Sequence, residues 1–106
     1  MSRQPDPPAT YLAQDGMWPA GPFRADAPAL TAPTARYTAA VRAELQRRGW
    51  TIARLASETG MTAAWASRML RGLTWPDLDA VVRIEQVLGV SLFPADRVWP
   101  TSDGNS

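Results

Sequence analysis

The 106-residue sequence contains no cysteine and no histidine. Without cysteine, the chain can form neither a disulfide nor a thiolate metal site. Without histidine, it lacks the most common zinc ligand and the most common general base. The sequence also has no glycine-rich phosphate loop and no pairing of a nucleophile with a base. We therefore expect a protein that is not an enzyme, with no catalytic residue, no metal ligand and no cofactor.

Long hydrophobic runs are missing as well. No apolar segment approaches the roughly 20 residues that a helix needs to cross a bilayer. The N-terminal sequence MSRQPDPPAT has no basic patch followed by an apolar core, which a signal peptide would show. We therefore expect no membrane partner and a cytoplasmic location.

Lysine is absent too, and the arginines that supply all the positive side chains are unevenly distributed. Residues 37–72 contain six arginines and two glutamates, a net charge of +4. Residues 73–106 contain two arginines and five acidic residues, a net charge of −3. A basic half beside an acidic half is typical of a protein that presents one face to a polyanion. The alternative is a solvated helical surface whose charges happen to be uneven.

The first 36 residues contain seven of the ten prolines. Each proline removes a backbone donor and restricts the residue before it, so no helical or strand periodicity survives here. We predict a disordered or extended Pro/Ala-rich arm over residues 1–36. Trp18 and Phe23 are unusual in a spacer, and they could dock on the folded domain or bind a partner protein.

From Thr38 onward, apolar residues recur at helical spacing. Residues suited to cap helices precede these segments, and glycines follow them: the caps are Thr51, Thr62 and Asp77, and the glycines are Gly49, Gly60, Gly72 and Gly89. The pattern predicts an all-α fold, a compact bundle of four to five helices over residues 37–99. The fifth helix would be a short turn near residues 91–99, and a polar tail would follow over residues 100–106. We expect no strand.

The most informative stretch is TIARLASETGMTAAWASRML, residues 51–70. It predicts two short helices joined by a tight turn at Gly60, with the small Ala56 where the helices approach each other. Together with the LGVSL run at residues 88–92 and the proline two residues before Leu78, this stretch resembles the Xre/Cro family of helix-turn-helix regulators. The resemblance implies a lambda-repressor-like fold and a sequence-specific DNA-binding transcriptional regulator, most simply a repressor. Residues of about 62–71 would form the recognition helix in the major groove of double-stranded DNA.

The resemblance also implies which residues face DNA: Arg48, Thr51, Arg54, Thr62, Ala63, Ala64, Trp65, Ser67, Arg68, Arg71 and Trp75. The family often has glutamine at the position of Ile52 to bind a phosphate, which isoleucine cannot do. Arg68 is the best base reader, because a guanidinium can donate two bonds to guanine, although it could also bind a phosphate or solvent. Arg71 and Arg48 are either phosphate contacts or plain surface charges.

The two tryptophans in this set have alternatives as well. Trp65 could fill the volume that the small Ala66 leaves, contact DNA or join a protein interface. The Trp75 indole could donate to a phosphate or cover the core.

A homodimer is expected, because one domain reads too few base pairs to locate a site among many competitors. The C-terminal apolar residues Leu92, Phe93, Val98 and Trp99 are candidates for its interface. The alternative is that Phe93 and Trp99 fold back onto the core of the monomer.

A weaker resemblance runs from Trp50 to Val90, which is similar to the N-terminal helical domain of cyanases. In those enzymes the helical unit serves packing and oligomerisation. This resemblance implies a second possible function, a protein-interaction adaptor or antitoxin-like module. Such a module would use the bundle or the N-terminal arm to bind its partner.

Overall fold

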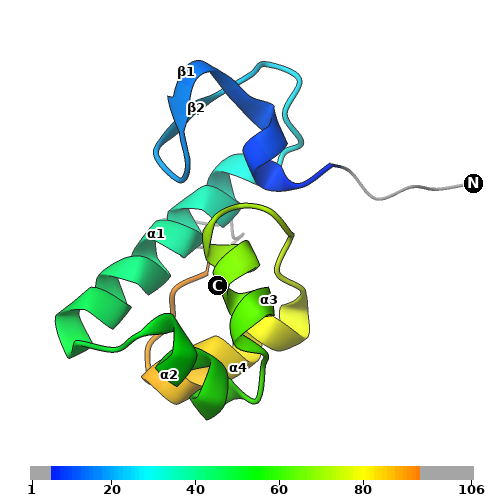
Figure 1. Ribbon diagram of the computed structural model, residues 1–106. Coiled ribbons are helices and arrows are strands. Elements are labelled where there is room, and N and C mark those ends of the chain that lie inside the picture. The colour runs from blue at the N-terminus through cyan, green and yellow to red at the C-terminus, as the bar shows by residue number, and fades with distance from the viewer. Residues whose placement is uncertain (1–5, 94–106) are drawn as a thin grey trace, which may run out of the picture.

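The computed structural model describes residues 6–93 (Figure 1). In chain order the elements are a 3-10 helix η1 (Pro8–Tyr11), strands β1 (Leu12–Met17) and β2 (Gly21–Phe23), and helices α1 (Thr31–Arg48), α2 (Ile52–Thr59), α3 (Ala63–Leu70) and α4 (Leu78–Leu88). The predicted helical bundle with a helix-turn-helix is confirmed, and it has four helices over this range. The expected fifth turn falls mainly on residues 94–99, outside the described residues.

The three predicted caps begin three of the helices. The Thr51 side chain accepts from the Arg54 amide at 3.0 Å, and the Thr62 side chain accepts from the Trp65 amide at 3.1 Å. The Asp77 carboxylate accepts from the Ala80 amide at 2.8 Å. Each cap satisfies a backbone donor that the first turn of a helix leaves without a partner, which is why these positions could be identified from local sequence.

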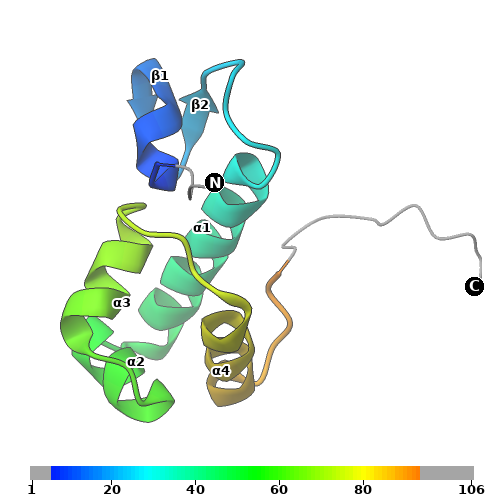
Figure 2. The ribbon, with the colours of Figure 1, turned by 90° about the vertical axis from the view of Figure 1, so that its right-hand side faces the viewer.

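One hydrophobic core joins all four helices. Its buried members are Tyr37, Val41, Leu45, Leu55, Met69, Leu70, Val81, Ile84 and Leu88. Figures 1 and 2 show that α1 runs along the length of the molecule, with α2, α3 and α4 packed beside it. None of the helices within residues 6–93 is both long and apolar enough to span a membrane.

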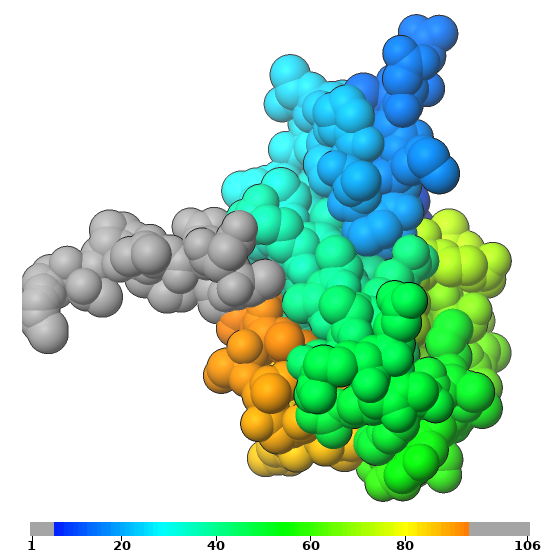
Figure 3. Space-filling model, turned by 90° about the vertical axis from the view of Figure 1, so that its left-hand side faces the viewer, coloured from blue at the N-terminus to red at the C-terminus, as the bar shows by residue number. Residues whose placement is uncertain are grey.

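The N-terminal region corrects the prediction of a disordered or extended arm without strands. Strands β1 and β2 form an antiparallel hairpin in which Leu12 pairs with Phe23 and Met17 pairs with Gly21, with an irregularity between the two pairs. We call residues 8–23 the N-terminal unit. It stands out from the end of the molecule that lies opposite α2 (Figure 3).

Helix α1 begins at Thr31, seven residues before the predicted start at Thr38. The prolines that argued against structure here occupy permitted places. Pro8 opens η1, and Pro33 lies in the first turn of α1, where a backbone N–H has no helical acceptor. The early part of α1 is packed rather than solvated, since the Thr31 and Ala35 side chains are buried.

Candidate nucleic-acid interface

Helices α2 and α3 form a tightly packed pair joined by residues 60–62. Leu55 and Ala56 of α2 are buried. Gly60 has a φ of 76°, and this left-handed conformation, which favours glycine, ends α2. The buried Thr59 hydroxyl donates to the Leu55 carbonyl at 2.7 Å, which satisfies a polar group inside the pair. The predicted helix-turn-helix is therefore closely held at the N-terminal end of α3.

Helix α3 separates its residues into two faces. Ala66, Met69 and Leu70 are buried against the core. The other face contains the exposed Ala63, Ala64 and Arg68 and the half-buried Ser67, with exposed Thr62 and Arg71 at the two ends. This face is one to two turns long, and it collects most of the residues expected to contact DNA.

Two arginines on this face are available to an anion. Within residues 6–93, the side chains of Arg68 and Arg71 have neither a hydrogen-bond nor an ion-pair partner. Arg54, on α2, lies 4.4 Å from the Trp50 ring centroid and 3.6 Å from the Glu58 carboxylate, but it is more than half exposed. The α2–α3 surface thus presents two unpaired guanidinium groups and one that is weakly paired.

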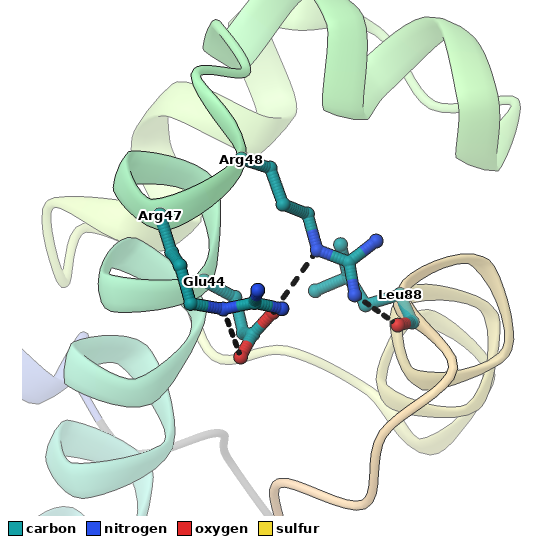
Figure 4. Close-up of polar contacts among 4 residues, drawn as sticks. All are labelled: Glu44, Arg47, Arg48 and Leu88. Atoms are coloured by element: carbon teal, nitrogen blue, oxygen red, sulfur yellow. Dashed lines mark hydrogen bonds and ion pairs between the residues drawn. The ribbon is translucent and has the colours of Figure 1, made fainter.

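Arg48 is used inside the molecule (Figure 4). Its Nε lies 3.0 Å from the Glu44 carboxylate, and it also donates to the carbonyl of Leu88, the last residue of α4. Arg47 binds the same carboxylate at 2.8 Å. Hydrogen bonds from Arg47 and then Arg48 hold the pKa of the Glu44 carboxyl below its ordinary value. Arg48, which was expected at DNA, therefore joins the end of α1 to the end of α4.

The two tryptophans of the predicted set make contacts within the chain. Trp65 is half-buried and packs against the core, and it lines a shallow hollow with Asp79 and Arg83 of α4. The Trp75 indole donates to the Asp6 carbonyl at 2.8 Å. Among the described residues, neither indole makes a cation-π contact with Arg68 or Arg71.

The structure places Trp18 on the folded domain, which is one of the two alternatives that the sequence left open, and adds contacts at the C-terminal end of α3 that were not specified. The Leu70 carbonyl accepts from the Trp18 indole at 3.1 Å and from the Arg42 guanidinium at 2.6 Å. The Ala9 amide donates to the Gly72 carbonyl at 2.9 Å. The one available signal was the presence of large aromatic residues in the N-terminal region.

An apolar groove of about 420 Å³ lies on another side of the domain. It is lined by Leu30, Thr34, Trp75, Pro76, Asp77, Leu78, Val81 and Phe93. Leu78 is 79% exposed and Leu30 is 57% exposed, although both are large apolar side chains.

The predicted interface residues lie partly in this region. Leu92 and Phe93 pack against the core, and the Phe93 ring meets the Tyr37 ring edge-on at 5.6 Å. The backbone amides of Leu92 and Phe93 both donate to the Glu85 carboxylate. Val98 and Trp99 lie outside the described residues.

Comparison with known proteins gives one family result. A helix-turn-helix family model matches residues 41–93, half of the chain. No curated protein and no solved structure matched the chain. The matched stretch contains α2, α3 and α4 and the second part of α1, whereas the N-terminal unit lies outside it.

Proposed function

Because the chain belongs to the Xre/Cro-type helix-turn-helix family, we propose that it is a sequence-specific transcriptional regulator that inserts α3 into the major groove of duplex DNA. The observation that carries this proposal is the exposed face of α3, on which Arg68 and Arg71 have no partner within residues 6–93. Repression is the simplest form of regulation for such a domain, because an operator-bound domain can block access to a promoter.

Each residue of this surface has a distinct part in the proposal. Arg68 reads a base, since its guanidinium can donate two bonds to O6 and N7 of guanine. Ala63 and Ala64 offer only methyl contacts, which suit a thymine methyl group. Arg71 and Arg54 bind phosphates and so fix the register of α3 on the duplex.

Binding should depend strongly on salt. The two phosphate-binding arginines on each of two subunits, Arg54 and Arg71, would neutralise about 4 phosphates, so log affinity should fall with log salt at a slope of about −4. A gel-shift or fluorescence titration on duplexes from around the gene measures this slope. An affinity that does not change with salt concentration, or no retardation of any duplex at low salt, would refute the proposed function.

We include a homodimer in this proposal, because two recognition helices about 34 Å apart would read two half-sites. The groove beside Phe93 supports this, since Leu30 and Leu78 leave an apolar surface next to α4 that the arginines of α3 do not line. Such a surface is typical of an interaction site. The second copy of the chain is the occupant that we propose for it.

Leu78→Asp should therefore convert the dimer into a monomer, because it places a charge in the proposed interface. Sedimentation of the full chain at micromolar concentration measures the mass directly. Val82→Asp, another exposed apolar position of α4 but not a groove residue, is the matched control and should leave the dimer intact. If the wild-type chain sediments as a monomer with and without DNA, the groove is not a homodimer interface. It would then be open to another protein, as an adaptor or antitoxin-like function requires.

A further inference from the structure

We propose that the N-terminal unit positions the recognition helix, with Trp18 as its main positioning residue. The unit fixes the C-terminal end of α3 and so determines how Arg68 and Arg71 are presented. The consequence for DNA rests on the proposed function, whereas the positioning of α3 is a property of the chain alone.

Helix α3 needs support from outside. It is eight residues long, and a helix of two turns has little stability of its own in water. Its N-terminal end is held by the Thr62 cap and the turn after α2. At its C-terminal end the last carbonyls have no partner within the helix and must find donors elsewhere.

Leu70, the last residue of α3, receives two such donors on its carbonyl oxygen. One is the Trp18 indole N–H at 3.1 Å, and the other is the Arg42 guanidinium at 2.6 Å. Trp18 belongs to the N-terminal unit and Arg42 to α1, so the carbonyl is tied to two different parts of the fold. A carbonyl oxygen has two lone pairs, and both are used here.

The backbone after α3 is covered by the same unit. A Cβ on Gly72 would lie 2.6 Å from the Trp18 ring and 3.0 Å from the Ala9 Cβ, so the ring rests directly on this glycine. The Ala9 amide donates to the Gly72 carbonyl at 2.9 Å. Phe23 meets the Trp18 ring edge-on at a centroid distance of 6.0 Å and supports it from within the hairpin.

These contacts lie close to the residues that would touch DNA. Arg68 and Arg71 are within two residues of Leu70, so a shift at that end of α3 displaces both guanidinium groups. Base reading needs groups held to within about 0.5 Å, which requires support from neighbouring contacts. Residues 8–23 lie outside the stretch that the family model matches, so these contacts come from outside the matched domain.

The test is Trp18→Phe in the full chain, which keeps an aromatic ring over Gly72 but removes the N–H donor. The matched control is Trp75→Phe, which also removes an indole donor, to the Asp6 carbonyl, without touching α3. The readout is hydrogen exchange of the amides of Arg71, Gly72 and Leu73, which donate to carbonyls within α3. We expect exchange at these amides to accelerate about tenfold in Trp18→Phe, the factor expected for one net hydrogen bond, and to stay unchanged in the control.

A second readout separates this inference from the proposed function. The assay uses a pool of duplexes randomised at their central positions. Trp18→Phe should keep its affinity for the unselected pool, because the arginine charges that bind phosphates are unchanged. It should lose about tenfold in its preference for selected duplexes, because the position of α3 against the bases is changed. If the wild-type chain binds no duplex while the exchange result holds, the regulator is refuted and the positioning stands. Unchanged exchange at these amides, or equal acceleration throughout the four helices, would overturn the positioning role.

Discussion

Replacing Gly72 by alanine is expected to lower the free energy of unfolding by about 2–5 kcal/mol. Gly72 has a φ of 75°, and a left-handed conformation costs a residue with a Cβ about 1–2 kcal/mol. The new Cβ would also lie 2.6 Å from the Trp18 ring, and overpacking of this kind costs about 1–3 kcal/mol. Urea denaturation followed by circular dichroism measures the change.

Gly49→Ala separates the two causes. Gly49 has a similar φ of 69°, but a Cβ there would meet nothing within 4 Å, so only the conformational cost of about 1–2 kcal/mol remains. In a Trp18→Ala background most of the extra cost at Gly72 should disappear, because the clashing ring is gone and only the Ala9 Cβ at 3.0 Å remains close. Equal costs at Gly72 and Gly49 in the wild-type background would show that Trp18 does not rest on Gly72.

Arg68→Ala should cause the largest loss of DNA affinity, about 1–3 kcal/mol for each subunit and twice that for a dimer. The loss should be concentrated at one base position of each half-site, because the guanidinium is expected to read a base there. Arg71→Ala should instead weaken all sequences alike and reduce the salt slope by about 1 per subunit. Affinities for a selected duplex and its single-base variants measure both effects.

Arg47→Ala is the matched control for these substitutions. It removes the same charge, but Arg47 is an exposed residue of α1 that, within residues 6–93, binds only the Glu44 carboxylate, which Arg48 also holds. Its affinity for DNA should stay close to that of the wild type. Uniform weakening by Arg68→Ala would assign that side chain to a phosphate, and no weakening would remove α3 from the interface and favour a protein-binding function.

The second, third and fourth helices could be predicted because their signals are local. The side chains of Thr51, Thr62 and Asp77 accept hydrogen bonds from backbone amides three residues later, so each cap can be identified from the neighbouring sequence. The division of α3 into a buried and an exposed face follows from helical periodicity in the same way. These local signals also determine the order of the helices, and hence the helix-turn-helix.

The start of α1 was missed because the buried face of its first turns is formed largely by threonines and not by large apolar residues. Thr31, Thr34 and Thr38 are all buried, although threonine is mostly exposed in proteins, so the apolar periodicity on which the prediction relied does not mark this end of the helix. The sequence indicated that Trp18 could dock on the folded domain, but not where, since its acceptor on Leu70 is 52 residues away. For Arg48 the sequence contains a local signal, Glu44 four residues earlier, but not the acceptor on Leu88, which is 40 residues away.

Helix α1 also determines where this chain can be cut for protein engineering. The family match begins at residue 41, in the middle of a helix that starts at Thr31. A fusion module excised at residue 41 would lose Tyr37, which is fully buried and packs edge-on against Phe93. It would also lose the indole that binds the end of α3. A chimeric regulator built from this chain should therefore contain residues 6–93 without a break or truncation within that range.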